Sequence, residues 1–290
     1  MDLFSQLLTN GIIIGATYAL VAIGLTLIFG MMRIVNFAHG EFYMLGAYVA
    51  VSAATEFNLG YFMALPVAVV LISIVGFVFE RVFLRPLRKA DILSTALVTI
   101  GLSIFFQNTA LVIWGPKPGQ IVDPFGGANL VFGNIGVTEI RMFALSVAVA
   151  AMVGLGLLIK YTKVGRMMRA TFQDRDAAAL QGIEVDHVYS LSFVIGVALA
   201  ALAGALLSAI FVVSPDMGNM ANLKSFAVVI LGGLGNIPGA VAGGFLLGLA
   251  ESFGAGYISA GYKDGISFLL LIVILLIRPY GLFGREGSET

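Results

Sequence analysis

Long apolar runs separated by short polar segments dominate this sequence and limit what it can fold into. A transmembrane helix needs about 20 mostly apolar residues. Of the 290 residues, 59% are apolar and only 11% are charged. The candidate spans are 7–30, 37–54, 61–79, 92–114, 142–159, 189–213 and a last run at 266–277, which reaches spanning length only if it begins near residue 257. We therefore expect a single all-α polytopic transmembrane domain over residues 1–290, with seven or eight transmembrane helices.

The positive charges predict the orientation of these helices, because cytoplasmic loops of membrane proteins carry an excess of Lys and Arg. With alternating spans, twelve of the 16 Lys and Arg residues fall on one side and four on the other. The twelve are Arg33, Arg81, Arg85, Arg88, Lys89, Lys160, Lys163, Arg166, Arg169, Arg175, Arg278 and Arg285; the four are Lys117, Arg141, Lys224 and Lys263. We expect a multi-pass protein of the cell inner (plasma) membrane, with the N-terminus outside and the C-terminus in the cytoplasm.

Composition narrows the classes of function. The formal net charge is zero, which gives no indication of a nucleic-acid partner, and the absence of Cys excludes disulfides and Cys-based zinc sites. The sequence has no Gly-x-x-x-x-Gly-Lys-Ser/Thr loop, so any ATP must be bound by another chain. No nucleophile–base arrangement stands out. We expect a protein that is not an enzyme and that binds no cofactor or metal itself.

An apolar segment at 226–253 is broken in its middle by the sequence GGLGNIPG at 232–239. Asn236 is suited to cap a second helix, with Pro238 in its first turn. Non-helical backbone at membrane depth is tolerated only where it is buried in protein or faces water. We therefore expect a re-entrant hairpin or a pair of short spans, because this arrangement leaves the last two arginines on the cytoplasmic side.

Two loops are long enough to interact with partners. The outer loop, at about 115–140, is rich in Gly and Pro and can form a hairpin or dock a partner. The inner loop, at about 160–188, predicts a short Ala-rich helix over 169–181 that Gly182 ends. Such a helix would give a partner subunit a rigid projection through which to transmit a movement. The alternative is an ordinary amphipathic surface helix that links two spans. The proposed contacts are close approach at Ala177 and Ala178 and polar anchoring by Arg169, Arg175 and Asp176.

The pattern Asp-Ala-Ala, three residues, then Gly at 176–182 resembles the Glu-Ala-Ala-x-x-x-Gly coupling loop of ABC importer permeases. Three further segments resemble the branched-chain amino acid permease family: GATYAL at 15–20 with Gly24, NFAHGEF at 36–42, and the glycine-rich block at 232–248. The match is closer to the shorter of the family's two permease types. The resemblance implies a second, related permease subunit, two cytoplasmic ATPase subunits that bind ATP and Mg²⁺, and a periplasmic or extracellular solute-binding protein.

Polar residues at the edge of a predicted span are candidates for the translocation path. Asn36, His39 and Glu41 are unusual there, because charged residues within a membrane are costly and commonly face a cavity or a partner. The functional interpretation is a polar patch that lines the path or controls a gate. The alternative is that these residues lie at the interface, solvated or capping a helix.

The glycine-rich break also has two interpretations. The helix N-terminus at Gly235 and Asn236 presents free N–H groups that suit a substrate carboxylate. Glycines at four-residue spacing are instead typical of tight helix packing, the role we assign to Gly11, Gly15, Gly239, Gly243 and Gly248. We expect Glu251 to lie at the outer interface or to pair with a neighbour such as Lys263. Gln107 and Asn108 are expected to form interhelical hydrogen bonds.

Together with the transmembrane pattern, the resemblance implies the membrane-spanning permease subunit of an ATP-driven ABC importer for leucine, isoleucine and valine or related small solutes. Such a subunit forms half of the translocation path and couples to a separate ATPase. The alternative function is an ion-gradient-driven secondary transporter or channel for small solutes.

Overall fold

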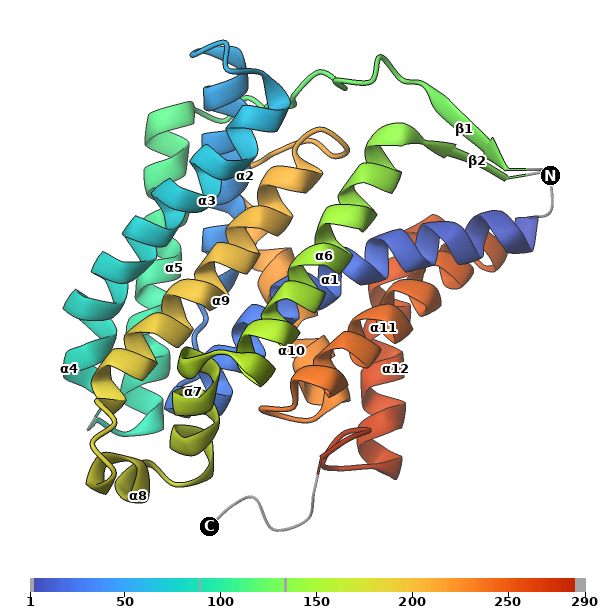
Figure 1. The fold of residues 1–290 in the computed structure, drawn as a ribbon. Helices are drawn as coiled ribbons and strands as arrows, with labels where there is room; N and C mark the ends of the chain where they lie inside the picture. The colour runs from blue at the N-terminus through green and yellow to red at the C-terminus, as the bar shows by residue number, and fades with distance from the viewer. Residues whose placement is uncertain (1–2, 89, 133–134, 285–290) are drawn as a thin grey trace.

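The chain is an all-α polytopic membrane protein (Figure 1). The computed structural model describes residues 3–88, 90–132 and 135–284, so Lys89 and Arg285 of the basic segments lie outside the described residues. The helices are α1 (Leu3–Met32), α2 (His39–Thr55), α3 (Gly60–Phe79), α4 (Arg85–Leu87), α5 (Ile92–Trp114), α6 (Glu139–Tyr161), α7 (Lys163–Gln173), α8 (Arg175–Leu180), α9 (Val185–Leu207), α10 (Met217–Gly232), α11 (Ile237–Tyr257) and α12 (Lys263–Ile277). A π-helical turn η1 (Glu80–Leu84) joins α3 to α4, and a 3-10 turn η2 (Ala260–Tyr262) precedes α12.

Seven helical segments among the described residues are long and apolar enough to cross a membrane. They are α1, α3 continued through η1 and α4, α5, α6, α9, α11, and η2 with α12. The helices α2 and α10 are shorter, at 17 and 16 residues. In the outer loop, β1 (Asn129–Phe132) pairs antiparallel with β2 (Ile135–Thr138), so that loop forms a hairpin.

The helices α1 and α9 form the core of the bundle. In their most apolar stretches, 78% of α1 and 72% of α9 is buried, against 11% of α5 and 6% of the segment that contains α12. Apolar side chains on α5, α6 and α12 are therefore left facing outward. Such surfaces suit lipid or a partner subunit, because they would be costly to expose to water.

Glycines bring α1 and α11 into direct backbone contact. A Cβ on Gly248 would lie 2.4 Å from the Cα of Gly15, and a Cβ on Gly11 would lie 2.9 Å from the Cα of Leu249. A Cβ on Gly15 would lie 2.8 Å from the Cα of Phe245. No side chain fits at these separations, so glycine permits this crossing of the two helices.

The same device holds α11 against α10. A Cβ on Gly239 would lie 2.2 Å from the carbonyl oxygen of Gly232, and one on Gly243 would lie 2.8 Å from the carbonyl oxygen of Val228. The five glycines expected to pack helices therefore lie at two contacts, α1 with α11 and α10 with α11.

The broken segment has the expected turn but different helix bounds. Asn236 caps α11 by accepting a hydrogen bond from the amide of Gly239 at 2.9 Å, and Pro238 lies in the first turn. Gly233 and Gly235 adopt left-handed φ angles of 100° and 78°. The first helix begins at Met217 rather than at 226, and α11 has 21 residues. The segment is thus one short helix followed by one helix of spanning length, not two short spans.

The described basic segments gather at one end of the molecule. Figure 1 shows α4, α7 and α8 at the same end as the C-terminal end of α12, whereas the N-terminal end of α1 and the β hairpin lie toward the opposite end. At the former end Asp91 caps α5 and accepts hydrogen bonds from Ser94, which lower the pKa of its carboxyl. Lys224 departs from the expected pattern, because it lies in α10 and is largely buried rather than in an outer loop.

The predicted single helix over 169–181 is wrong, because the chain breaks at Asp174. That residue is extended and ends α7, and its side chain accepts hydrogen bonds from the amides of Asp176 and Ala177, both at 2.9 Å, to begin α8. The predicted stop is correct: Gly182 has φ +81° and its amide donates to the carbonyl of Ala179. The amide of Ile183 donates to Ala178, which completes a Schellman C-cap.

Candidate translocation site and coupling helices

The chain re-enters the bundle after α1 and starts α2 in the protein interior. Asn36 is completely buried, and its side-chain oxygen accepts a hydrogen bond from the amide of Ala38 at 3.1 Å. His39, the first residue of α2, places Nε2 3.1 Å from the carbonyl oxygen of Val21, in the middle of α1. Glu41 is 1% exposed. These residues therefore lie inside the bundle, and the alternative of a solvated interfacial position is wrong.

The start of α10 lies against the start of α2. A Cβ on Gly40 would be 2.1 Å from the carbonyl oxygen of Gly218, so the two backbones touch. Asn222, one turn further along α10, donates its side-chain amide to the carbonyl of Phe37 at 2.7 Å. Two helix starts therefore meet inside the protein, where non-helical backbone is tolerated because other parts of the chain cover it.

The helix α5 presents a row of polar side chains to this junction. Thr95, Thr99, Ser103 and Gln107 recur every four residues, so they share one face of the helix. The amide of Phe37 donates to the hydroxyl of Thr99 at 3.2 Å, and Ser103 donates to Oε1 of Glu41 at 2.8 Å. Gln107 lines an open cavity one turn beyond Ser103. The row thus connects that cavity with the buried carboxylate.

Several buried polar atoms at this junction lack a hydrogen-bond partner among the described residues. They are Nδ2 of Asn36, Nδ1 of His39, Oε2 of Glu41 and Oδ1 of Asn222. Most buried polar groups in proteins are paired, so such a group calls for a specific explanation. Their concentration where α2, α5 and α10 meet marks this junction as a candidate binding or gating site.

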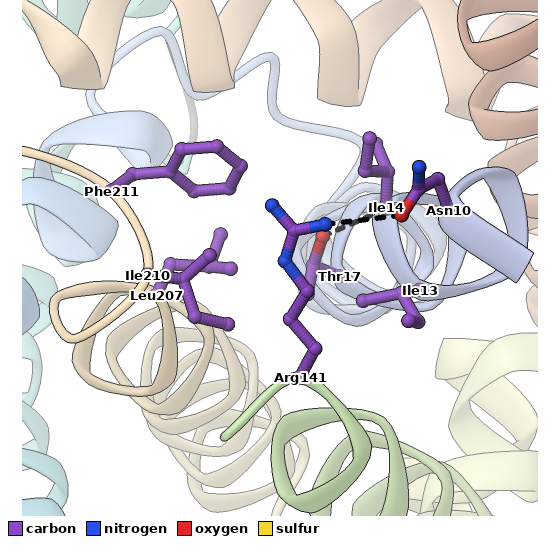
Figure 2. A pocket seen from close by; sticks show the side chains of 8 residues that line it. All are labelled: Asn10, Ile13, Ile14, Thr17, Arg141, Leu207, Ile210 and Phe211. Atoms are coloured by element: carbon purple, nitrogen blue, oxygen red, sulfur yellow. Dashed lines mark hydrogen bonds between the residues drawn. The ribbon is translucent and has the colours of Figure 1, made fainter. Parts of the chain in front are cut away.

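Two cavities differ in what they can accommodate. Figure 2 shows the smaller, where Arg141 of α6 donates to the side-chain oxygen of Asn10 at 3.0 Å beside apolar residues of α1 and of the chain at the end of α9. Its volume of about 20 Å³ suits a water molecule and not an amino acid. The second cavity measures about 350 Å³, within the range of small-ligand sites. It is lined by Gln107, Asn108, Leu111, Pro215 and Asp216.

The glycine-rich break does not meet the α2–α10 junction, because the two lie at opposite ends of α10. The side-chain amide of Asn236 donates to the carbonyl of Phe283 at 3.1 Å. Gly235 lies against Gly30 at the end of α1, and the ring of Phe172 from α7 contacts both glycines. The break is therefore part of the end that carries α7 and α8.

A buried ionic network holds α12 to the rest of the bundle. Glu251 is completely buried and pairs with Lys224 at 2.9 Å and with Lys263 at 3.3 Å. Tyr18 donates to Glu251 at 2.7 Å, and Asp264 pairs with Lys224 at 2.9 Å. The expected contact of Glu251 with Lys263 is confirmed, and Lys224 is a second partner that the sequence did not indicate.

The helix α8 projects from the basic end of the molecule with most of its surface free. The side chains of Arg175 and Asp176 are 72% and 87% exposed, and Leu180 is 88% exposed. Ala178 is buried against the rest of the chain, whereas Ala177 is exposed. Of the two alanines, Ala177 is therefore the one that a partner could contact. Arg169, on α7, instead contacts the backbone carbonyl of Ile159 and stabilises the turn from α6.

Comparison with known proteins now identifies the family. The model of the branched-chain amino acid transport system permease component matches residues 7–275. The chain belongs to this family of permeases. It is 39% identical to the high-affinity branched-chain amino acid transport system permease protein LivH of Salmonella typhimurium, over 99% of this chain and 97% of the relative. It is 40% identical, over the same shares, to BraD of Pseudomonas aeruginosa, which bears the same description.

This permease is also similar, at lower identity, to the longer of the two permease types. The permease protein LivM of Escherichia coli is 25% identical, over 91% of this chain and 67% of the relative. No solved structure matches the permease. The closer similarity to LivH and BraD over nearly their full lengths confirms the predicted resemblance to the shorter permease type.

Several residues at the junction of this permease were missed by reasoning from the sequence. Ser103, Thr99 and Asn222 were not singled out, although the four-residue spacing on α5 was a readable signal. Gln107 and Asn108 were expected to bond between helices. Asn108 instead donates to the carbonyl of Ile104 in its own helix at 2.7 Å, and both residues line the larger cavity.

Proposed function

We propose that this chain is the membrane-spanning permease subunit of an ATP-driven ABC importer of leucine, isoleucine and valine. Its partners are a second, related permease of the LivM type, two cytoplasmic ATPase subunits and a solute-binding protein outside the membrane. The observation that carries the proposal is the near-full-length similarity to proteins described as high-affinity branched-chain amino acid transport permeases. The similarity to LivM supports the heteromeric pairing.

The orientation follows from the basic end of the molecule. Because Lys and Arg concentrate in cytoplasmic loops, the end that carries α4, α7 and α8 faces the cytoplasm. The N-terminus and the β hairpin then face outward, in the inner membrane of a bacterium or its equivalent. This orientation makes α8 accessible to a cytoplasmic ATPase. It also makes the larger cavity, lined by Gln107 and Asp216, accessible to a binding protein.

Coupling to the ATPase takes place through α8. Its exposed Leu180 supplies an apolar contact, while Arg175 and Asp176 supply polar ones. The helix is held at both ends, by the Asp174 cap and by Gly182, so a force applied to it moves the chain on either side. Phe172 contacts Gly235 and Gly30, which extends that connection to the break between α10 and α11.

The translocation path runs along the sides of α5 and α10 that the rest of this chain does not cover. A second permease encloses the path on those sides. The cavity of about 350 Å³ forms its outer part, and the polar row on α5 leads inward to Asn36, His39 and Glu41 at the start of α2. The sparse packing of α5 supports this assignment, since only 11% of its apolar stretch is buried within the chain.

Purification of the assembled complex tests this function. We expect the tagged chain, expressed with the neighbouring transport genes of its source, to copurify with one second permease and two ATPase subunits, counted by native mass spectrometry. ATP hydrolysis by that complex should rise when leucine-loaded binding protein is added. A chain that purifies alone from those cells, with no ATPase attached, would contradict the proposal.

A further inference from the structure

Among the residues that the structure describes, three glutamates are buried inside the bundle, and they differ in their partners. Glu80 and Glu251 are completely buried, and Glu41 is 1% exposed. Glu80 pairs with Arg88, and Glu251 pairs with Lys224. Glu41 forms no salt bridge with any residue in the ranges that the structure describes, and its Oε2 has no hydrogen-bond partner there.

The contrast among the three is physically informative. Desolvation penalises a buried carboxylate that has no cation beside it. The chain compensates two of its three buried glutamates with Arg or Lys and leaves the third without such a partner. Within a membrane, an ionisable residue of this kind commonly faces a ligand path. Glu41 therefore has the properties of a group that receives its cation from outside the chain.

The surroundings of Glu41 leave two acceptors free. Ser103 donates to Oε1 at 2.8 Å, whereas Oε2 faces Gly218, where a Cβ would lie 2.4 Å from it. Asn222, one turn along α10 from Gly218, uses its amide nitrogen to bind the carbonyl of Phe37 and leaves Oδ1 unpaired. The facing sides of α2 and α10 thus offer a carboxylate oxygen and an amide oxygen to a donor.

The approach to this pair is acidic. The larger cavity is lined by one acid, Asp216, and by no basic residue. Gln107 on its wall lies one helical turn from Ser103, which is bonded to Glu41. Asp216 thus lines the cavity itself, whereas Glu41 lies beyond its wall and is bonded to Ser103, one helical turn along α5 from Gln107. The electrostatics favour a ligand whose leading group is positively charged.

We infer that Glu41, assisted by Oδ1 of Asn222, receives the α-ammonium group of the transported amino acid. An ammonium group carries three N–H donors, which suit these two vacant acceptors and the backbone around them. This inference rests on the proposed function, since it concerns the substrate of the same path. It assigns Glu41 a role in holding the substrate, distinct from coupling to the ATPase.

Substrate uptake by the reconstituted complex tests this role. The wild-type complex in proteoliposomes, with ATP inside and binding protein outside, provides the baseline, and its failure to accumulate leucine would count against the proposed function itself. In Glu41→Gln we expect the initial rate of leucine uptake to fall about tenfold or more, because a charge-assisted contact is lost. ATP hydrolysis stimulated by binding protein should remain within about twofold of wild type. Ser103→Ala, which keeps the carboxylate, should transport far better than Glu41→Gln.

Two fragments of leucine provide a second measurement that does not depend on the binding protein. Isoamylamine keeps the ammonium group and the side chain, whereas isocaproate keeps the carboxylate and the side chain. We expect isoamylamine to raise the melting temperature of the solubilised wild-type complex, isocaproate to leave it unchanged, and Glu41→Gln to abolish the effect. Wild-type rates of uptake in Glu41→Gln, or a complex stabilised by Na⁺ and not by isoamylamine, would overturn the inference. Loss of both uptake and ATP hydrolysis in an assembled Glu41→Gln complex would overturn it as well.

Discussion

At the residue scale, the fold depends on positions where a side chain is either forbidden or must be paired. The glycines between α1 and α11 belong to the first kind, since backbone atoms occupy the space that a Cβ would need. Glu251 and Lys224 belong to the second, since both charged side chains are largely or completely buried. Both kinds make sharp predictions, because the environment leaves little room for adjustment.

Gly248→Ala should destabilise the protein. A Cβ there would lie 2.4 Å from the Cα of Gly15, so α1 and α11 must move apart, at a cost of about 1–3 kcal/mol. The measurement is the thermal unfolding of the purified chain in detergent. The matched control is Gly154→Ala in α6, where no atom lies within 4 Å of the added Cβ. Equal melting temperatures for the two variants would show that this contact is not tight.

Glu251→Gln should destabilise the bundle by about 3–5 kcal/mol, because it removes the buried carboxylate that pairs with both lysines and leaves the largely buried Lys224 with only the half-exposed Asp264. Thermal unfolding again provides the measurement. Adding Lys224→Met to the same chain should recover part of the loss, since the ammonium group that has lost its buried partner disappears. A double variant less stable than Glu251→Gln alone would argue against the pairing.

At the element scale, α8 and α10 show which helix boundaries can be predicted from the sequence and which cannot. Cap residues were readable: Asn236 and Gly182 act locally through bonds to their own neighbours. The break at Asp174 was missed, because Asp is compatible with a helix interior until its side chain finds two free amides. The start of α10 was missed because residues 217–225 are too polar to resemble a span.

Asn222 and Ser103 show what sequence reasoning cannot supply. Each is an ordinary polar residue on its own helix, and its significance comes from partners at Phe37 and Glu41, which lie far away in the sequence. Asn36, His39 and Glu41 could be predicted as candidates because polar residues in an apolar run are conspicuous. Whether they were buried or interfacial depended on how deeply the chain re-enters after α1, which apolar periodicity does not determine.

Asp174→Ala should disorder α8 and weaken attachment of the ATPase. A helix of six residues is not stable alone, and an N-cap of this kind contributes about 0.5–2 kcal/mol. Copurification of the ATPase subunits with the tagged permease measures the effect. Asp174→Asn, which retains a capping oxygen, should preserve the complex. Equal recovery of ATPase with both variants would show that the cap does not matter for coupling.

At the scale of the whole molecule, the permease has two distinct ends. The basic end carries α7, α8 and the break before α11, and the other end carries the β hairpin (Figure 1). Between them, the exposed sides of α5 and α12 are left for lipid or for a second permease. In the proposed complex, the chain forms half of the translocation path.

Cysteine labelling in intact membranes tests the orientation. The sequence contains no Cys, so Val122→Cys in the outer loop and Gln181→Cys after α8 each introduce a single exposed thiol. An impermeant maleimide should label Val122→Cys from outside the cell and Gln181→Cys only in inverted vesicles. The reverse pattern would place the basic end outside and contradict the assignment of α8 to a cytoplasmic partner.

The most direct test of the central claim is leucine accumulation in proteoliposomes that contain this chain, its related permease and the ATPase subunits, with binding protein added outside. We predict that accumulation requires ATP inside the vesicles and every one of these partners, and that ionophores which collapse H⁺ and Na⁺ gradients do not reduce it. Accumulation by this chain alone, driven by an ion gradient and abolished by those ionophores, would contradict the account.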